Sequence, residues 1–398
     1  MLKISIFCFL YLLLASVEFP LLAHAQKGTN QEIIKETNEL KEELNTEHQE
    51  NEVQGEAFED DGYLQEDEEE DRENQTIFLE NIKKVNFSAA IEFEAFYEKT
   101  DSGGTKEEAS ELTLSSAEFI VEAEVNNCLR TYVQIEDEDE EGVVVSEAII
   151  HFQAEDVCEP DLSCDSFWYA SIGKMDIPFG YFESHLISDA VTLELGETKG
   201  KAVIIGAYNT FMNVFTGIYD GEMMKTGSED RIENHFAAIY LTLPHTEDND
   251  LDLVYGVSYI SNIADSDELI EFINDEFDTE TVENYVPGAS VSLSASLNEQ
   301  YYLETEYVIA LEEFKEDKLF EPKAWNIEFA FCPTDEIKFT LGYSGSEDAV
   351  DFLPETHVGI ACGYDIFDDV SIGIECFQDK FENYDETIGV ISQFRIEF

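Results

Sequence analysis

Basic residues are scarce in this sequence. It has 21 Lys and Arg against 90 Asp and Glu in 398 residues, which gives a formal net charge of −69. Proteins that bind nucleic acid neutralise its phosphates with Lys and Arg, so this composition argues against a nucleic-acid partner. Aromatic residues make up 12% of the chain, which argues against disorder over most of its length.

Long apolar runs are also missing beyond the first residues. No later stretch approaches the roughly 18 apolar residues that indicate a transmembrane helix. The start of the chain has Lys3, an apolar stretch over 4–17 and the small residues Ala23 and Ala25, which together are typical of a secretory signal peptide. We predict that residues 1–25 are removed on export. The alternative, an N-terminal membrane anchor, requires a longer apolar run.

Catalytic motifs are absent as well. The sequence has no Gly-rich phosphate loop, no Gly-x-Ser-x-Gly elbow and no His-Glu-x-x-His helix, and its seven His residues are scattered. We therefore expect no enzyme activity and no cofactor. Cys158 and Cys164 bracket a short loop and could form a disulfide in an exported protein, and their spacing fits no zinc site.

Two segments precede the folded part. Residues 31–50 are rich in Glu, Lys, Asn and Leu and carry a narrow helical apolar stripe, and residues 60–73 are an acidic run typical of a solvated linker. The expected organisation is a signal peptide over 1–25, a periplasmic helical and acidic linker segment over 26–80, and a β-barrel over 81–398.

From Val85 onward the apolar residues recur with a period of two. In the last segment Ile388, Val390 and Phe394 alternate with Gly389 and Gln393, which indicates strands with one apolar and one wet face. One strand changes parity at Ser115-Ser116, which predicts a bulge. The predicted strands are 85–97, 109–125, 128–137, 142–153, 166–176, 200–209, 211–220, 231–243, 250–261, 286–297, 300–311, 322–332, 335–344, 356–365, 369–377 and 386–398.

The connections between these strands alternate between long and short. Long ones span 98–108, 178–199, 262–285 and 345–355. Bacterial outer-membrane barrels have an even number of strands, short periplasmic turns and longer external loops. The fold class is therefore an all-β transmembrane antiparallel barrel of about 16 strands, ending in an aromatic Phe398, in the bacterial outer membrane. The alternative, a secreted soluble β-rich binding or surface protein, would show similar alternation.

The third external connection carries the candidate site. In 16-stranded porins this loop commonly folds inward, and Pro178 and Gly180 favour a sharp turn at its start. Charges that line such a constriction would select permeants by sign. The alternative is an ordinary solvated loop. The candidate constriction residues are Lys174, Asp176, Pro178, Phe179, Gly180, Phe182, Glu183, Asp189, Glu194 and Glu197.

The same stretch carries a family resemblance. Residues 173–174, 178–180, 182–183 and 187–189, followed by Thr-Leu-Glu-Leu-Gly-Glu at 192–197, resemble the LbtU-type siderophore porins, the legiobactin-receptor family. The resemblance implies an outer-membrane barrel that imports ferric siderophore without a plug domain. Its expected partners are a siderophore or another small solute and outer-membrane lipid, and it could form a homo-oligomer.

The charge of the expected lumen favours a different permeant. Inward acids predicted from the alternation outnumber the inward bases Arg130, Lys338 and Arg395, so polyanions should be disfavoured. A ligand would then be neutral or cationic, or divalent ions would offset the acids. A general cation-preferring diffusion porin is accordingly the second candidate function. The inward acids are Glu92, Glu94, Glu136, Glu304, Glu306, Glu328 and Glu375.

Overall fold

The structure is a computed structural model, and it describes residues 82–138, 142–153, 166–227, 232–243, 251–277, 281–315, 320–350, 352–383 and 385–398. The predicted signal peptide, the 26–80 segment and the Cys158–Cys164 pair lie outside these residues.

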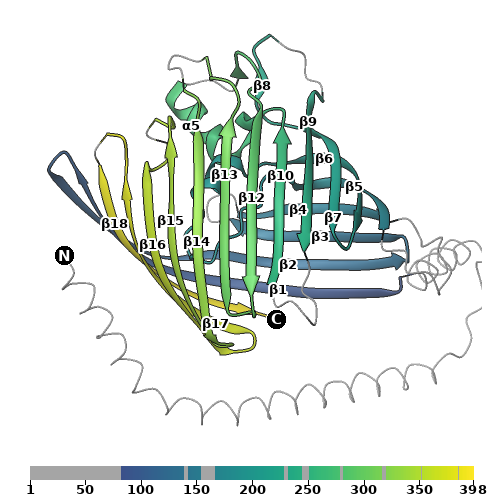
Figure 1. Cartoon of the computed structure of the whole chain (residues 1–398), viewed down its shortest axis with the longest axis horizontal. Helices are drawn as coiled ribbons and strands as arrows, with labels where there is room; N and C mark the ends of the chain where they lie inside the picture. Colours follow the sequence, from purple (N-terminus) through teal and green to yellow (C-terminus); the bar gives the residue numbers. More distant parts are fainter. Residues whose placement is uncertain are drawn as a thin grey trace, which may run out of the picture. The chain divides into compact units, whose positions relative to one another are not determined.

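Sixteen strands among the described residues form one closed antiparallel barrel (Figure 1). The first strand pairs with the last, and Ala89 and Phe398 exchange two backbone hydrogen bonds at that junction. The strands are β1 (Lys84–Ser102), β2 (Thr105–Asn126), β3 (Leu129–Glu138), β4 (Gly142–Gln153), β5 (Ser166–Asp176), β6 (Lys199–Asn209), β7 (Met212–Asp220), β9 (Asn234–Leu243), β10 (Leu251–Ile260), β12 (Gly288–Leu297), β13 (Tyr301–Ala310), β14 (Lys323–Thr334), β15 (Ile337–Glu347), β16 (Thr356–Phe367), β17 (Val370–Lys380) and β18 (Glu386–Glu397).

The barrel confirms the predicted fold class, and every predicted segment corresponds to one strand. The predicted bulge is present, because the β1–β2 register passes from Glu92 opposite Ser116 to Phe93 opposite Leu114 and skips Ser115. A bulge of this kind restores the apolar face after an extra residue.

The expected long connection over 98–108 is wrong. β1 and β2 continue as a ladder to Ser102 and Thr105, and a tight turn at Gly103 and Gly104 joins them. Both glycines have positive φ, which glycine adopts without a steric penalty. The polar residues at the end of this hairpin pair across the strands, as in the ion pair between Lys99 and Glu108. The paired strands therefore extend beyond the segment in which apolar residues alternate.

Large apolar side chains cover the outer face of the barrel. Along β5 and β6 the exposed residues are Trp168, Ile172, Val203 and Ile205, and similar sets follow the other strands. An apolar belt of this extent is stable against lipid and not against water. The chain is therefore a β-barrel of the bacterial outer membrane.

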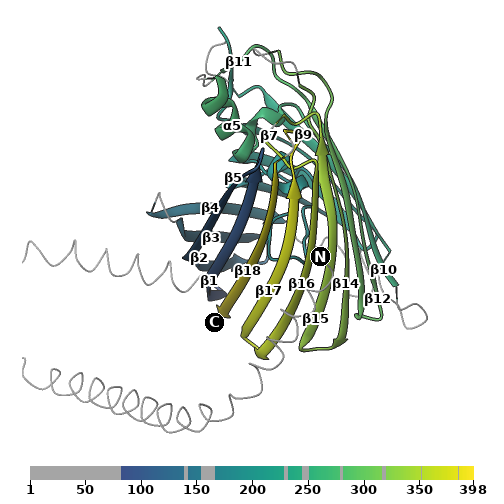
Figure 2. The ribbon, with the colours of Figure 1, turned by 90° about the vertical axis from the view of Figure 1, so that its left-hand side faces the viewer.

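Short elements that the sequence did not predict lie at one end of the barrel (Figures 1 and 2). The β5–β6 connection contains α4 (Val191–Gly196), and the 262–285 connection contains η1 (Ile263–Asp265) and α5 (Asp267–Phe277). Two parallel two-residue strands, β8 (Met224–Lys225) and β11 (Thr281–Val282), join the β7–β9 connection to this same 262–285 connection. None of the helices in the described ranges is long and apolar enough to cross a bilayer.

The helix α5 packs through one face. Leu269 and Ile273, four residues apart, are fully buried, and they belong to an apolar core that includes Leu195 of α4. Side chains at this spacing lie on the same side of a helix. The core extends to the inward residues Phe215 and Phe236 of the barrel wall. Apolar side chains therefore fill one side of the lumen at the end of the barrel where α5 lies.

Candidate functional site

Residues 178–198, which connect β5 to β6, cross the interior of the barrel, and we call them the strap. β5 is hydrogen-bonded only to β4 and β6 in the barrel order. The strap nevertheless contacts strands across the barrel, since the Gly180 N–H donates to Ser258 Oγ of β10 at 2.8 Å and the Tyr240 hydroxyl of β9 donates to the Gly180 carbonyl. A connection that returns to the adjacent strand after such contacts must run through the lumen.

Glu306 on β13 forms the first anchor of the strap. Its two carboxylate oxygens accept the backbone N–H groups of Tyr181 at 2.8 Å and Phe182 at 3.0 Å. The Ser290 hydroxyl of β12 donates to the same carboxylate at 2.6 Å. Hydrogen bonds to an ionised acceptor are stronger than neutral ones. The Glu306 carboxylate therefore satisfies strap N–H groups that have no partner in the β-sheet.

Glu328 on β14 forms the second anchor. It accepts the His185 N–H at 2.6 Å and the Ser184 hydroxyl at 3.0 Å. The Asn326 amide on the same strand donates to it at 2.8 Å. The strap is fixed on the next strand too, because the Thr340 hydroxyl of β15 donates to the His185 carbonyl at 3.0 Å.

Glu375 on β17 forms the third anchor, far around the barrel from β5. It accepts the N–H of Ile187 at 2.6 Å, the N–H of Ser188 at 3.0 Å and the Ser188 hydroxyl at 2.7 Å. The three anchor acids thus receive successive parts of the strap in order. The strap reaches from the β5 wall to the β17 wall.

These anchors correct one expectation from the sequence. Glu306, Glu328 and Glu375 were expected to line the open lumen, but they are 8%, 1% and 0% exposed. Glu304 is buried as well, 3.7 Å from His185 Nε2. The alternation correctly assigns these side chains to the inner face. It does not show that a distant loop occupies that face and binds them.

The start of the strap has a compact conformation. β5 ends at Asp176 and Pro178 follows, while Gly180 and Phe182 both have positive φ, at 82° and 52°. A Cβ on Gly180 would lie 2.2 Å from the Phe182 ring. Phe179 is buried and meets that ring edge-on at 6.4 Å, so glycine is required where the turn folds back on itself.

The acidic candidates of the strap fall into two groups. Glu183 and Asp189 are exposed, while Glu194 of α4 and Glu197, which directly follows α4, are half-buried. Burial, followed by neighbouring acids, raises the pKa of Glu194 to about 7. Burial also raises the pKa of Glu197 to about 7, against the opposing effect of the Lys199 ammonium.

Lys174 and Asp176 lie on β5 and not on the strap, at a seam where β4 and β5 separate. Pairing between these strands ends at Ala148 opposite Lys174. Beyond it, Lys174 Nζ donates to the Val145 carbonyl at 3.0 Å and the Asp176 N–H donates to Glu147 at 3.1 Å. Side chains therefore satisfy the backbone groups that the seam leaves unpaired.

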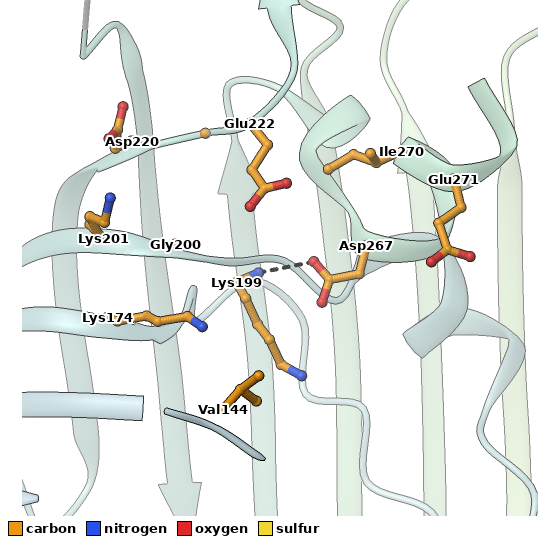
Figure 3. A pocket seen from close by; sticks show the side chains of 11 residues that line it. Val144, Lys174, Lys199, Gly200, Lys201, Asp220, Glu222, Asp267, Ile270 and Glu271 are labelled. Atoms are coloured by element: carbon orange, nitrogen blue, oxygen red, sulfur yellow. Dashed lines mark hydrogen bonds between the residues drawn. The ribbon is translucent and has the colours of Figure 1, made fainter. Parts of the chain in front are cut away.

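A pocket of mixed charge lies at this seam (Figure 3). Lys174, Lys199 and Glu222 are among the residues that line it, and the Lys199 N–H donates to Asp267 of α5 at 3.3 Å. Both signs of charge line the pocket, so it selects neither anions nor cations by sign alone. Among the residues that the structure describes, no group of three or more His, Cys, Asp and Glu is arranged to hold a metal ion.

The two sides of the barrel differ in what covers their inner face. Most inward side chains from β6 to β15 are buried by the strap and the apolar core, but near the short turns of these strands Tyr208, Asn213 and Thr242 are half-buried. Inward side chains of β1–β3 and β18 are half-buried and face the remaining lumen. The buried set includes Ala202, Phe215, Phe236, Ser258, Ser290, Ser292, Val308, Asn326, Thr340 and Ser344. The half-buried set includes Glu92, Glu94, Glu118, Tyr132, Gln134, Glu136, Gln393 and Arg395.

The uncovered side, which we call the open wall, is acidic. Glu118 and Glu136 lie directly opposite each other on β2 and β3. Arg395 of β18 forms ion pairs with Glu92 and Glu397, and Gln393 donates to Glu94 at 3.0 Å. The remaining lumen is thus bordered by more carboxylates than cations within the described strands.

Comparison with known proteins supports a porin-like outer-membrane barrel. No protein-family profile matches the chain. The UPF0422 protein of Coxiella burnetii (strain RSA 493 / Nine Mile phase I) is 25% identical over 316 residues, which cover 76% of this chain and 65% of that protein. The chain therefore spans less than two thirds of the length of this curated relative.

Solved structures of outer-membrane proteins share the fold. The anion-selective porin from Comamonas acidovorans is similar with a TM-score of 0.53 and 11% identity, over 79% of this chain and 99% of that one. A loop L8 deletion mutant of OmpT, an outer membrane protein of Vibrio cholerae, has a TM-score of 0.52 and 13% identity, over 78% and 99%. At these identities the likeness establishes the barrel fold and nothing about the permeant.

Proposed function

We propose that the chain is a passive outer-membrane channel that prefers cations and lets small solutes diffuse past the strap along the open wall. The observation that carries this proposal is the difference between the two sides of the lumen. The strap and the apolar core bury most inward residues from β6 to β15 outside the short-turn end of the barrel, while the polar residues of β1–β3 and β18 keep access to water. A channel function requires no catalytic group, and none is proposed.

The sign of the preference follows from the open wall. Glu92, Glu94, Glu118 and Glu136 face the lumen there, and Arg395 is already paired with two carboxylates. Rings or clusters of acids in a pore concentrate cations and repel anions. The anchor acids add little to this field, because backbone N–H groups and hydroxyls surround them.

Uptake of a ferric siderophore is the finer proposal. It is favoured by the run from Gly173 to Glu197, which carries the resemblance to siderophore porins and whose larger part forms the strap. The acids of the open wall require such a ligand to be neutral or cationic. Import would be diffusive or facilitated, since the described barrel holds the strap in its lumen.

Reversal potentials in planar lipid bilayers test the channel proposal. Refolded mature chain in a tenfold KCl gradient should give current steps and a reversal potential of the sign that marks cation permeation. Anion preference would refute the proposed selectivity. Growth of a deletion strain under iron restriction, with candidate ferric siderophores added back, tests the finer proposal, and unchanged growth on every siderophore would refute it.

Three further expectations stay predictions. N-terminal sequencing of protein from outer membranes tests signal-peptide removal after residue 25. Limited proteolysis tests a boundary near residue 81 between linker and barrel. Chemical cross-linking in the membrane tests assembly into a homo-oligomer.

A further inference from the structure

An uncharged pocket lies on the inner wall of β4–β9, at the end of the barrel where short turns join the strands. That end faces the periplasm in bacterial barrels. Neither a carboxylate nor a Lys or Arg side chain lines this pocket, although the chain has 90 acids. Its lining residues are His151, Tyr169, Tyr208, Asn209, Met212, Asn213 and Thr242.

Three aromatic rings line the pocket, those of His151, Tyr169 and Tyr208. The Tyr169 ring lies 6.0 Å from the Tyr208 ring and 5.6 Å from the His151 ring, centroid to centroid. A Cβ on Gly206 would lie 2.4 Å from the Tyr169 ring. Glycine at this position therefore lets the Tyr169 ring lie against the wall, and any other residue would displace it.

Amide and hydroxyl groups border these rings. The Tyr169 hydroxyl donates to Asn213 Oδ1 at 3.1 Å, and Gln153 Nε2 donates to the Tyr208 hydroxyl at 2.9 Å. His151 Nδ1 is 2.9 Å from Ser171 Oγ. These bonds fix the orientation of the rings and place neutral hydrogen-bonding groups at their edges.

A second set of rings connects the pocket to the strap. Tyr240 lies opposite Asn213 in the β7–β9 register. Its ring stacks on Phe215 at 6.0 Å and lies 6.2 Å from Tyr181 of the strap. Aromatic and neutral polar groups thus continue along one wall from the strap to the periplasmic end, and we call this wall the aromatic track.

We propose that the aromatic track binds neutral solutes that carry a ring with an apolar face and hydroxyl groups at its edge, and passes them from the strap toward the periplasm. The inference rests on the proposed channel function and specifies its substrate class. Aromatic side chains pack against the apolar face of a ring, and amide and hydroxyl neighbours pair with ring hydroxyls. The acids of the open wall disfavour anionic solutes that carry such a ring. The track itself is uncharged, so it has no group that would favour a charged solute.

Two simple probes show which class of compound supplies the ring. Catechol represents hydroxylated aromatic rings and glucose represents sugars, and benzoate is the anionic control. Saturation-transfer NMR on the refolded full chain in detergent measures binding without requiring conduction. The native chain should bind catechol or glucose and not benzoate.

Variants place the binding on the track. The double substitution Tyr169→Ser with Tyr208→Ser should weaken probe binding about tenfold. Tyr169→Phe, which keeps the ring but removes its hydroxyl, should weaken binding less than the double substitution. Tyr302→Ser on β13, which lies outside the pocket, should leave it nearly unchanged. If the double variant does not fold, Gly206→Ala provides the second test, because its Cβ displaces the Tyr169 ring.

Each outcome supports or overturns the inference. Binding of either probe that the track variants weaken supports it, and the probe that binds identifies the source. Binding of neither probe, equal binding in native and track variants, or stronger binding of benzoate overturns it. Bilayer recordings are made separately, so a chain that binds the probe but does not conduct would refute the channel and not the track.

Discussion

Ser188 and Glu375, 187 positions apart in the sequence, are joined by two hydrogen bonds. The backbone N–H of Ser188 donates to Oε2 at 3.0 Å and its hydroxyl donates to Oε1 at 2.7 Å. This contact fixes the strap to β17, a strand that lies across the barrel from β5. The constriction therefore depends on buried acids of the wall as much as on the strap itself.

Substitution of Glu375 should loosen the strap. Glu375→Ala leaves the N–H groups of Ile187 and Ser188 without acceptors, and each unpaired buried group costs roughly 1–3 kcal/mol. We expect larger single-channel conductance and a lower unfolding temperature in detergent. Glu107→Ala, which removes an exposed acid of the β1–β2 hairpin, is the control and should change neither. Native conductance in the Glu375 variant would show that the strap is held by other means.

Two strand glycines should differ sharply in their tolerance of alanine. A Cβ on Gly173 would lie 1.9 Å from the Ala148 carbonyl oxygen, whereas a Cβ on Gly363 meets its nearest atom at 4.0 Å. Gly173→Ala should destabilise the barrel by at least ~3 kcal/mol, because backbone must move. Gly363→Ala should stay within about 0.5 kcal/mol of the native value. Heat-dependent mobility on gels measures both, and equal midpoints would contradict the β4–β5 geometry.

The part of the strap that contains α4 should become less stable as pH rises. Burial raises the pKa of both Glu194 and Glu197 from an ordinary 4.5 to about 7. Between these values the folded strap holds more protons than the unfolded one, so its stability falls with increasing pH and has lost this contribution above about 7. The charged groups that face these two acids are Asp176, Asp189, Lys199, Asp267, Glu268, His357 and Asp379.

Hydrogen exchange measures this pH effect. After correction for the intrinsic rate, amides of residues 191–197 should exchange faster at pH 8 than at pH 5. The double substitution Glu194→Gln with Glu197→Gln should remove most of the difference. A native strap that is better protected at pH 8 would reverse the predicted sign.

Charge changes on the open wall should shift ion selectivity in opposite directions. A unit charge ~4 Å from a hydrated ion is worth on the order of 1 kcal/mol, about a fivefold change in local ion concentration. Arg395→Gln should raise the K⁺ to Cl⁻ permeability ratio, and Glu92→Gln should lower it. Lys106→Gln, at the exposed hairpin, is the matched control. Reversal potentials report each ratio, and shifts of the same sign in both wall variants would contradict the account.

The sequence predicted the barrel well because each strand has a wet and a lipid-facing side. That alternation alone located the sixteen strands and the bulge at Ser115. It missed α5, whose only local signal was the spacing of Leu269 and Ile273 inside an expected loop. It also missed the pairing of charges that lengthens the first hairpin.

The sequence pointed to the segment that forms the strap, and its role as a constriction stays a prediction. The three anchor acids lie 124–188 positions away from the strap residues they bind, as for Phe182 with Glu306 and Ile187 with Glu375. No local pattern encodes such contacts. The aromatic track could have been noticed as inward positions of neighbouring strands that carry Tyr and Asn and lack acids, although its location beneath the strap depends on the fold.

Cysteine accessibility tests the division of the lumen most directly. In a background with the native cysteines replaced by serine, Glu94→Cys places a thiol on the open wall and Ser292→Cys places one behind the strap. A charged methanethiosulfonate reagent should react with the first and reduce the channel current within seconds to minutes, and should leave the second unmodified. Equal reaction at both positions would contradict the central claim that the strap closes one side of the barrel and leaves the acidic side as the path.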